Sequence, residues 1–162
     1  MAAKTEHRKR PAGRGAWGPL GPPYEFLDHP ADVGFIARGR TLKELFENAA
    51  TAMLAYGWEL STVRARQRVQ IQASGTDRES LLYAWLSEIL SLTDARGFAF
   101  KRVAVTKYKA QGTRYQVQGT AFGEPFDRTR HRAHTYIKAV TYHQLSVKEA
   151  PAGWTATVYL DV

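Results

Sequence analysis

The sequence contains no cysteine and no apolar run close to the roughly 18 residues that span a bilayer. The lack of cysteine excludes disulfides, zinc sites built on thiolates and cysteine nucleophiles. It leaves oxygen and imidazole groups as the available metal ligands, so any bound metal is expected to be a fairly hard cation. The first residues also lack the apolar middle region of a secretion signal, and we therefore expect a cytoplasmic protein.

The composition is that of a folded domain with an excess of positive charge. Hydrophobic residues make up 44% of the 162 residues, enough for the packed interior of one domain. Residues 1–23 carry half of the formal net charge of +8. They are rich in Gly and Pro and show no apolar period, which predicts a disordered basic arm ahead of a domain at residues 24–162. Such an arm either raises encounter rates with RNA or is a solvated extension without a dedicated partner.

Two amphipathic helices are predicted from apolar residues at helical spacing. Each follows a Thr-x-x-Glu capping box and is stopped by glycine, the first over Thr41–Gly57 and the second over Thr76–Gly97. This order predicts an α+β fold with two helices packed on a mostly antiparallel sheet, and the two helix units indicate an internal duplication. Alternating or apolar segments predict strands at 33–37, 63–73, 98–109, 115–122, 135–142, 145–149 and 154–162, of which 98–109 and 115–122 form a hairpin.

Asp28, His29 and Asp32 form the first group of candidate functional residues. His29 precedes Pro30, so its backbone should be extended, which predicts a loop that enters the strand at 33–37. Two carboxylates and an imidazole on one loop are suitable metal ligands. Taken singly, each Asp is equally compatible with a turn residue that hydrogen-bonds its own backbone.

Lys138, His143 and Asp161 are further ionisable residues among apolar neighbours. Such groups are uncommon in strand-like segments unless they are paired, bind a metal or take part in chemistry. Alternation along the last strand places Asp161 on its polar face, near the strand end. The alternatives are a solvated Asp161, a Lys138 that prevents edge pairing, and a His143 that makes one ordinary hydrogen bond.

Three arginines, Arg64, Arg66 and Arg68, lie on the outer face of the strand predicted at 63–73. They are candidate contacts for RNA or phosphate. A basic stripe of this kind is also compatible with a solvated sheet face, and no exposed aromatic residue alternates with it for base stacking.

Several of these segments together resemble the archease family, in the family's order over residues 24–162. The family's usual acidic loop reads Asp-His-Thr-Ala-Asp, and Pro30 here takes the place of the threonine, which removes a hydroxyl and an N–H. The segments that carry the resemblance are Asp28-His-Pro-Ala-Asp-Val-Gly, Thr41-Leu-Lys-Glu-Leu-Phe-Glu-Asn-Ala-Ala, Gly-Glu-Pro-Phe-Asp127, Ile-Lys138-Ala-Val-Thr-Tyr-His143 and Leu-Asp161-Val.

The resemblance implies a duplicated strand-helix-strand-strand fold and a role as an accessory protein without catalysis of its own. Archeases assist the RtcB-type RNA ligase of tRNA splicing and RNA repair, which uses GTP and a divalent metal, by promoting its guanylylation. The resemblance implies Asp32, Lys138 and Asp161 as essential residues, with Asp28 and His29 beside them. The acidic residues would hold Ca²⁺, Mg²⁺ or Mn²⁺, and Lys138 would orient them or contact the ligase.

Two other classes of function remain open from the residues alone. An acidic cluster with a lysine and histidines also suits a small metal-dependent phosphohydrolase that acts without a partner. The basic arm and the three arginines suit a general RNA-binding or chaperone module, whose affinity would fall steeply with salt.

Overall fold

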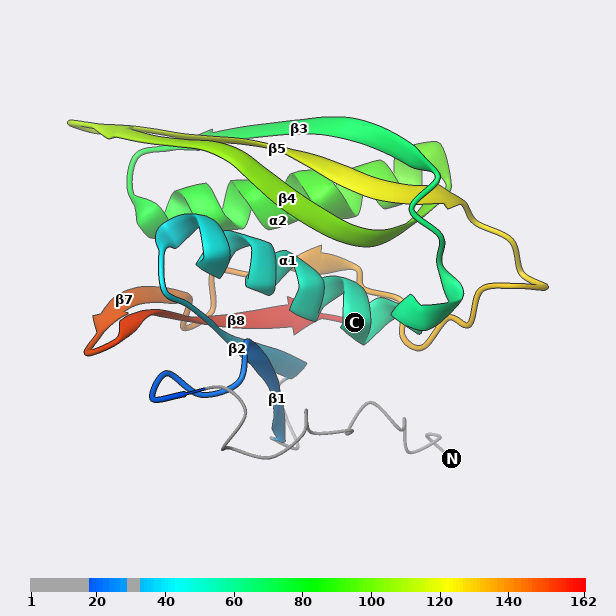
Figure 1. The fold of residues 1–162 in the computed structure, drawn as a ribbon, viewed down its shortest axis with the longest axis horizontal. Coiled ribbons are helices and arrows are strands. Elements are labelled where there is room, and N and C mark those ends of the chain that lie inside the picture. The colour runs from blue at the N-terminus through cyan, green and yellow to red at the C-terminus, as the bar shows by residue number, and fades with distance from the viewer. Residues whose placement is uncertain (1–17, 29–32) are drawn as a thin grey trace.

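A computed structural model describes residues 18–28 and 33–162. Antiparallel strands and two long helices make up most of it (Figure 1). None of the helices in these two ranges is both long and apolar enough to cross a membrane. In chain order the elements are β1 (Tyr24–Asp28), β2 (Val33–Gly39), α1 (Leu42–Gly57), the 3-10 turn η2 (Leu60–Thr62), β3 (Gln67–Gly75), α2 (Arg78–Arg96), β4 (Phe98–Gln111), β5 (Arg114–Pro125), β6 (Ala139–Val140), β7 (Ser146–Ala150) and β8 (Gly153–Asp161).

The strands form two antiparallel sheets with the helices between them (Figure 1). The larger sheet has the order β1, β2, β8, β6, and β7 also pairs with β8. The smaller sheet has the order β3, β5, β4. Helix α1 packs against β2 and β4, one strand from each sheet, and α2 packs mainly on β3. The predicted α+β class is confirmed, although a sheet covers the helices on both sides.

Each sheet contains the same succession of a strand, a helix and a hairpin. In the smaller sheet β3 and α2 are followed by the hairpin β4–β5, and β5 pairs with β3. In the larger sheet β2 and α1 are followed later by β7–β8, and β8 pairs with β2. The predicted duplication is therefore present, and one unit is inserted into the other.

The start of α1 is confirmed, and the start of α2 differs by one residue. At α1 the hydroxyl of Thr41 accepts a hydrogen bond from the backbone N–H of Glu44. At α2 the capping residue is Asp77: its carboxylate accepts from the N–H of Ser80 at 2.7 Å, and the Ser80 hydroxyl accepts from the N–H of Asp77 at 3.1 Å. The box predicted at Thr76 was wrong because an aspartate in the next position, followed by serine, forms the reciprocal pair.

Replacing Asp77 with alanine should lower the free energy of unfolding by about 1 kcal/mol, because the first turn of α2 loses the acceptor for one of its N–H groups. Urea denaturation followed by circular dichroism measures this loss. Thr76→Ala is the matched control, with an expected change within about 0.5 kcal/mol. Equal losses from the two variants would show that Asp77 does not cap the helix.

Two predicted strands have different bounds in the structure. β3 begins at Gln67, because before it the N–H of Arg64 donates to the side chain of Glu124 at 2.6 Å and not to a backbone carbonyl of β5. Of the strand predicted at 135–142, Ala139 and Val140 remain as β6. The preceding segment bends toward α1, where the N–H of His134 donates to the carbonyl of Gly57 at 2.8 Å.

β1 was not predicted, and it changes the setting of Asp28. This residue ends β1 and pairs with Val33 of β2, so it belongs to a hairpin strand and not to the predicted loop. Upstream, the carbonyl of Pro23 accepts from the N–H of Arg38 at 2.8 Å. The end of the segment predicted as a basic arm thus lies against β2, and the division at residues 23 and 24 stays a prediction.

Candidate functional site

The end of β8 brings Lys138 and Asp161 side by side. The backbone N–H of Lys138 donates to the carbonyl of Asp161 at 2.7 Å, and Ala139 is the strand partner of Asp161. Both charged side chains are exposed. The backbones at Lys138 and Asp161, 23 positions apart in the sequence, are therefore in contact, and Lys138 directly precedes β6.

The hairpin β1–β2 ends at the same place in the larger sheet. Asp28 pairs with Val33, and Val33 pairs with Leu160, the residue before Asp161. His29, Asp32 and the side chain of Asp28 lie outside the described residues. The described backbone thus places Val33, the residue after the acidic loop, beside the end of β8, with Asp28 one strand further away.

Asp161 is the predicted metal ligand whose side chain the structure describes. Its carboxylate makes no hydrogen bond or ion pair with residues 18–28 or 33–162, so its oxygens are available to a cation. Within those ranges no three His, Asp or Glu side chains gather in a way that could hold a metal. A carboxylate fits the hard divalent cations considered above. The cation stays a prediction, and its other ligands would come from Asp28, His29 and Asp32.

His143 lies in the turn after β6, on the same side of β8 as Asp161. Its exposed ring meets the ring of Tyr159 edge to face, with 5.3 Å between the centroids. Because Tyr159 and Asp161 are two residues apart on one strand, they share a face. His143 therefore borders the same surface, with its backbone N–H bonded to the hydroxyl of Thr141 at 3.3 Å.

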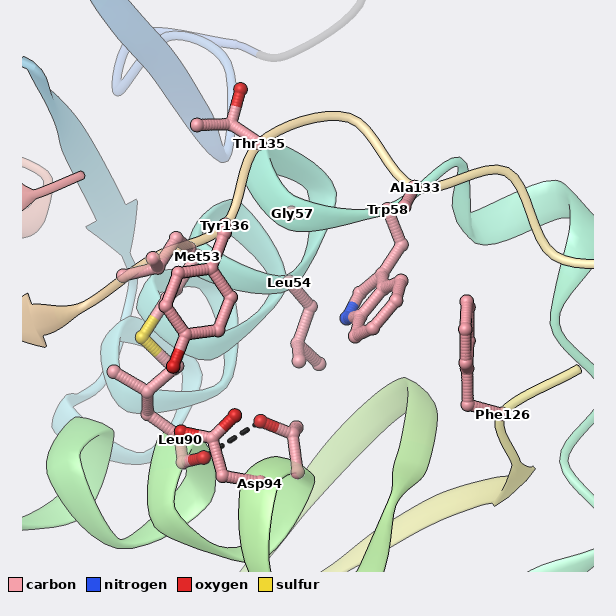
Figure 2. Close-up of a pocket in the computed structure, with 12 residues that line it drawn as sticks. Met53, Leu54, Gly57, Trp58, Leu90, Asp94, Phe126, Ala133, Thr135 and Tyr136 are labelled. Atoms are coloured by element: carbon pink, nitrogen blue, oxygen red, sulfur yellow. Dashed lines mark hydrogen bonds between the residues drawn. The ribbon is translucent and has the colours of Figure 1, made fainter. Parts of the chain in front are cut away.

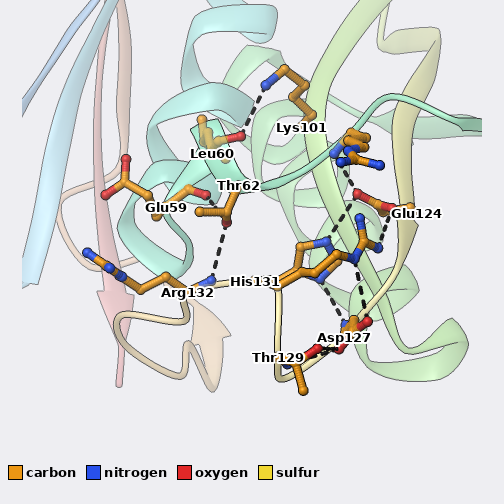
Figure 3. A network of polar contacts seen from close by, with 11 residues as sticks. Glu59, Leu60, Thr62, Lys101, Glu124, Asp127, Thr129, His131 and Arg132 are labelled. Carbon is orange, nitrogen blue, oxygen red and sulfur yellow. Dashed lines mark hydrogen bonds and ion pairs between the residues drawn. The ribbon is translucent and has the colours of Figure 1, made fainter.

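A second polar cluster, which the sequence did not reveal, surrounds Glu124 at the end of β5 (Figure 3). The Glu124 carboxylate is 2% exposed and accepts from the guanidinium of Arg130 at 2.7 Å. It also accepts from the N–H of Arg64 at 2.6 Å and lies 3.1 Å from Nε2 of His131. These contacts hold the pKa of Glu124 at about 2, below its ordinary value of 4.5, with the Arg130 hydrogen bond as the main cause.

His131 fixes the turn that follows Glu124. Its Nδ1 accepts from the N–H of Asp127 at 2.9 Å, so Nε2 carries the proton that points to Glu124. The Asp127 carboxylate accepts from the hydroxyl and N–H of Thr129, and these bonds lower its pKa. His131 is buried and uses both ring nitrogens.

Six exposed arginines come from the two chain segments that this cluster joins, and we call them the arginine face. Two of them, Arg64 and Arg66, precede β3, and Arg68 is the second residue of that strand. The Glu124 contacts bring a second arginine-rich segment alongside them. The arginine face consists of Arg64, Arg66, Arg68, Arg128, Arg130 and Arg132. Figure 3 shows the Arg132 side chain directed away from Glu124, toward Glu59.

A largely apolar pocket opens between the ends of α1 and α2 and the segment after β5 (Figure 2). Its volume is about 240 Å³. Trp58, Phe126 and Tyr136 are its aromatic lining residues, and Asp94 is the one charged residue in the lining. Figure 2 shows Tyr136 across the opening from Trp58 and Phe126.

The comparisons with known proteins define first a fold and then a family. The chain has the α+β fold of a solution structure from Methanobacterium thermoautotrophicum, with a TM-score of 0.74 and 34% identity over 86% of this chain and 99% of that one. A crystal structure from Thermotoga maritima, described as an archease and possible chaperone, shares the fold at a TM-score of 0.52 and 20% identity, over 84% of this chain and 94% of that one.

The family assignment comes from the sequence comparisons. The model of the archease protein family matches residues 24–162. Protein archease of Methanosarcina acetivorans is 38% identical over 88% of this chain and 97% of its own length. Protein archease of Aeropyrum pernix is 37% identical over 83% of this chain and 94% of its own length. The chain belongs to the archease family.

Proposed function

We propose that this protein activates an RtcB-type RNA ligase by promoting the metal-dependent guanylylation of that enzyme, so that the ligase completes many turnovers. Membership of the archease family supports this role. The observation that carries it is the backbone hydrogen bond from Lys138 to Asp161 at the end of β8, with Val33, the residue after the acidic loop, paired to the neighbouring Leu160.

The sheet gives Asp161 a fixed position. Leu160 is paired with β2 on one side of β8, and Asp161 is paired with β6 on the other. Ladder bonds on both sides hold the strand end more rigidly than a loop would. The exposed carboxylate can then bind a divalent cation together with ligands from the acidic loop, and such a cation neutralises triphosphate charge during guanylyl transfer.

Lys138 supplies the positive charge at this site. Its side chain is exposed at the residue before β6, whose backbone N–H bonds to Asp161, and its ammonium can contact phosphate oxygens of the bound nucleotide or acidic groups of the ligase. A lysine acts there as a point charge on a flexible stem. It therefore tolerates small changes of geometry as the two proteins come together.

Asp161→Ala and Lys138→Ala should each reduce multiple-turnover ligation by about 10- to 100-fold, the range observed when groups that support a metal site are removed. The assay uses the ligase, GTP, a divalent metal and an RNA substrate with a 3′-phosphate and a 5′-hydroxyl end. Circular dichroism checks that each variant folds. Lys148→Ala and Glu149→Ala, exposed positions on β7 of the same sheet, are the matched controls and should stimulate normally. Folded Asp161 and Lys138 variants that stimulate like the wild type would refute the proposal.

Three further measurements separate the alternatives. GTP hydrolysis by this protein without any ligase would instead favour a phosphohydrolase. Titration calorimetry with Ca²⁺, Mg²⁺ or Mn²⁺ should show binding that Asp161→Asn weakens. Deletion of residues 1–23 in the ligation assay tests whether the predicted arm contributes.

A further inference from the structure

The arginine face and the aromatic pocket are continuous, and the proposed role of Lys138 and Asp161 uses neither. Phe126 joins them: one hollow is lined by Phe126 together with Arg66, Arg128 and Arg130, and Phe126 also lines the pocket. The chain then runs along the pocket through Tyr136 and reaches Lys138 two residues later.

The arginine face carries a positive charge that its own acidic residues do not cancel. Glu124 and Asp127 are the carboxylates of the hollow, and both bind Arg130. The other five arginine side chains make no ion pair or side-chain hydrogen bond with any residue in the described ranges. Exposed guanidinium groups without carboxylate partners are well suited to phosphate oxygens, which they can bind through two N–H groups at once.

The pocket is suited to a planar ring with polar edges. The rings of Trp58 and Phe126 lie 5.3 Å apart, and Tyr136 is 68% exposed across the opening. An exposed tyrosine beside an open apolar pocket offers a stacking surface. Asp94 repels a phosphate group but accepts hydrogen bonds from the N–H groups on the edge of a base.

We propose that the arginine face and the pocket together bind single-stranded RNA, with backbone phosphates on the arginines and one unpaired base in the pocket. Proteins that bind single strands combine a basic track with aromatic rings on which bases stack. A base inside a duplex is already stacked and paired, so it could not enter the pocket. The choice of RNA over DNA rests on the proposed function, whereas the binding itself is measured without the ligase.

The first test removes charge from the arginine face. Fluorescence anisotropy of a labelled, unstructured RNA of about 12 nucleotides measures affinity for the full chain over roughly 50–200 mM salt. A variant with Arg66→Gln, Arg128→Gln and Arg132→Gln should bind more weakly, and the slope of log affinity against log salt should fall in magnitude by about 2. The control variant makes the same change of charge on exposed residues elsewhere, as Arg40→Gln, Lys43→Gln and Arg114→Gln.

The second test removes a stacking surface without a change of charge. Tyr136→Ala should weaken RNA binding by between about 5- and 150-fold and leave the salt slope unchanged. Tyr142→Ala is the control, because Tyr142 is 58% exposed outside the pocket, where it stacks on Tyr83. Because Tyr136 is so exposed, its replacement should leave the fold intact, and circular dichroism confirms this for each variant.

The outcomes that overturn the inference are distinct from failure of the proposed function. Undetectable RNA binding by the wild type, equal affinity of the two arginine variants, or equal affinity for a duplex of the same length would each refute it. Unchanged affinity in Tyr136→Ala would refute the placement of a base in the pocket. None of these results depends on whether Asp161 and Lys138 are needed for ligase turnover.

Discussion

Replacement of Trp85 with alanine should lower the free energy of unfolding by about 3–5 kcal/mol, the loss typical of a large buried ring. Trp85 lies in α2, is 0% exposed and donates its indole N–H to the carbonyl of Phe46 in α1 at 3.2 Å. The ring also lies against β5 so closely that a Cβ added at Gly119 would come within 2.6 Å of it. One side chain thus connects both helices and the smaller sheet.

Urea denaturation gives the size of this loss. Trp85→Phe is the matched control: it keeps an aromatic ring but leaves the Phe46 carbonyl without this donor, so its loss should be smaller than that of Trp85→Ala. A loss below about 1 kcal/mol for Trp85→Ala would show that the surrounding residues close the cavity, contrary to the packing described here. Trp85 touches none of the proposed functional residues, so the folded fraction of the variant should stimulate the ligase normally.

The helices were predictable because their signals are local. The apolar stripe of α2 is buried as its spacing indicated, and Gly97 ends the helix in a left-handed conformation with φ of 62°. The start of α2 was misplaced by one residue because Thr-x-x-Glu and Asp-x-x-Ser overlap there, and either pair can cap a helix. The buried residues of the stripe are Leu81, Leu82, Trp85, Leu86 and Ile89.

The sheets were less predictable because their pairing is not local. Nothing in the sequence near β2 indicates that its partner is β8, which follows more than 100 residues later. The insertion of one strand-helix-hairpin unit into the other follows from that pairing. The segment 135–138 has strand-like residues, yet its N-terminal neighbour His134 is bonded to the end of α1, and the pairing partners begin at Ala139.

The candidate site shows the same division between local and long-range information. The sequence singled out Lys138 and Asp161 because charged residues are unusual in apolar strands, and the backbone N–H of Lys138 bonds to the carbonyl of Asp161 where β6 pairs with β8. Glu124 and His131 carried no such signal, because a buried carboxylate near a Pro in a polar stretch looks like part of a loop. Their importance depends on Arg64, which is 60 residues away in the sequence and donates its N–H to Glu124.

The stability that Glu124 provides should disappear in acid. Its pKa is about 2 in the folded protein and near 4.5 when unperturbed, so the unfolded state takes up the proton first as the pH falls. The stabilising effect is fully present above about pH 4.5 and is lost progressively as the pH approaches 2. Protonation removes the charge that binds Arg130 and weakens the carboxyl group as an acceptor for the N–H of Arg64.

Glu124→Gln isolates this contribution from the other carboxylates. The difference in unfolding free energy between wild type and Glu124→Gln, measured by urea denaturation at a series of pH values, should be constant above about pH 5 and shrink toward pH 2. Glu88→Gln, at an exposed position on α2, is the control and should show no such trend. A difference that does not depend on pH would mean that the pKa of Glu124 is the same in the folded and the unfolded protein.

If the network also positions the arginine face, Glu124→Gln should weaken RNA binding at neutral pH, although it makes the net charge more positive. Tighter binding would show that charge alone governs that surface.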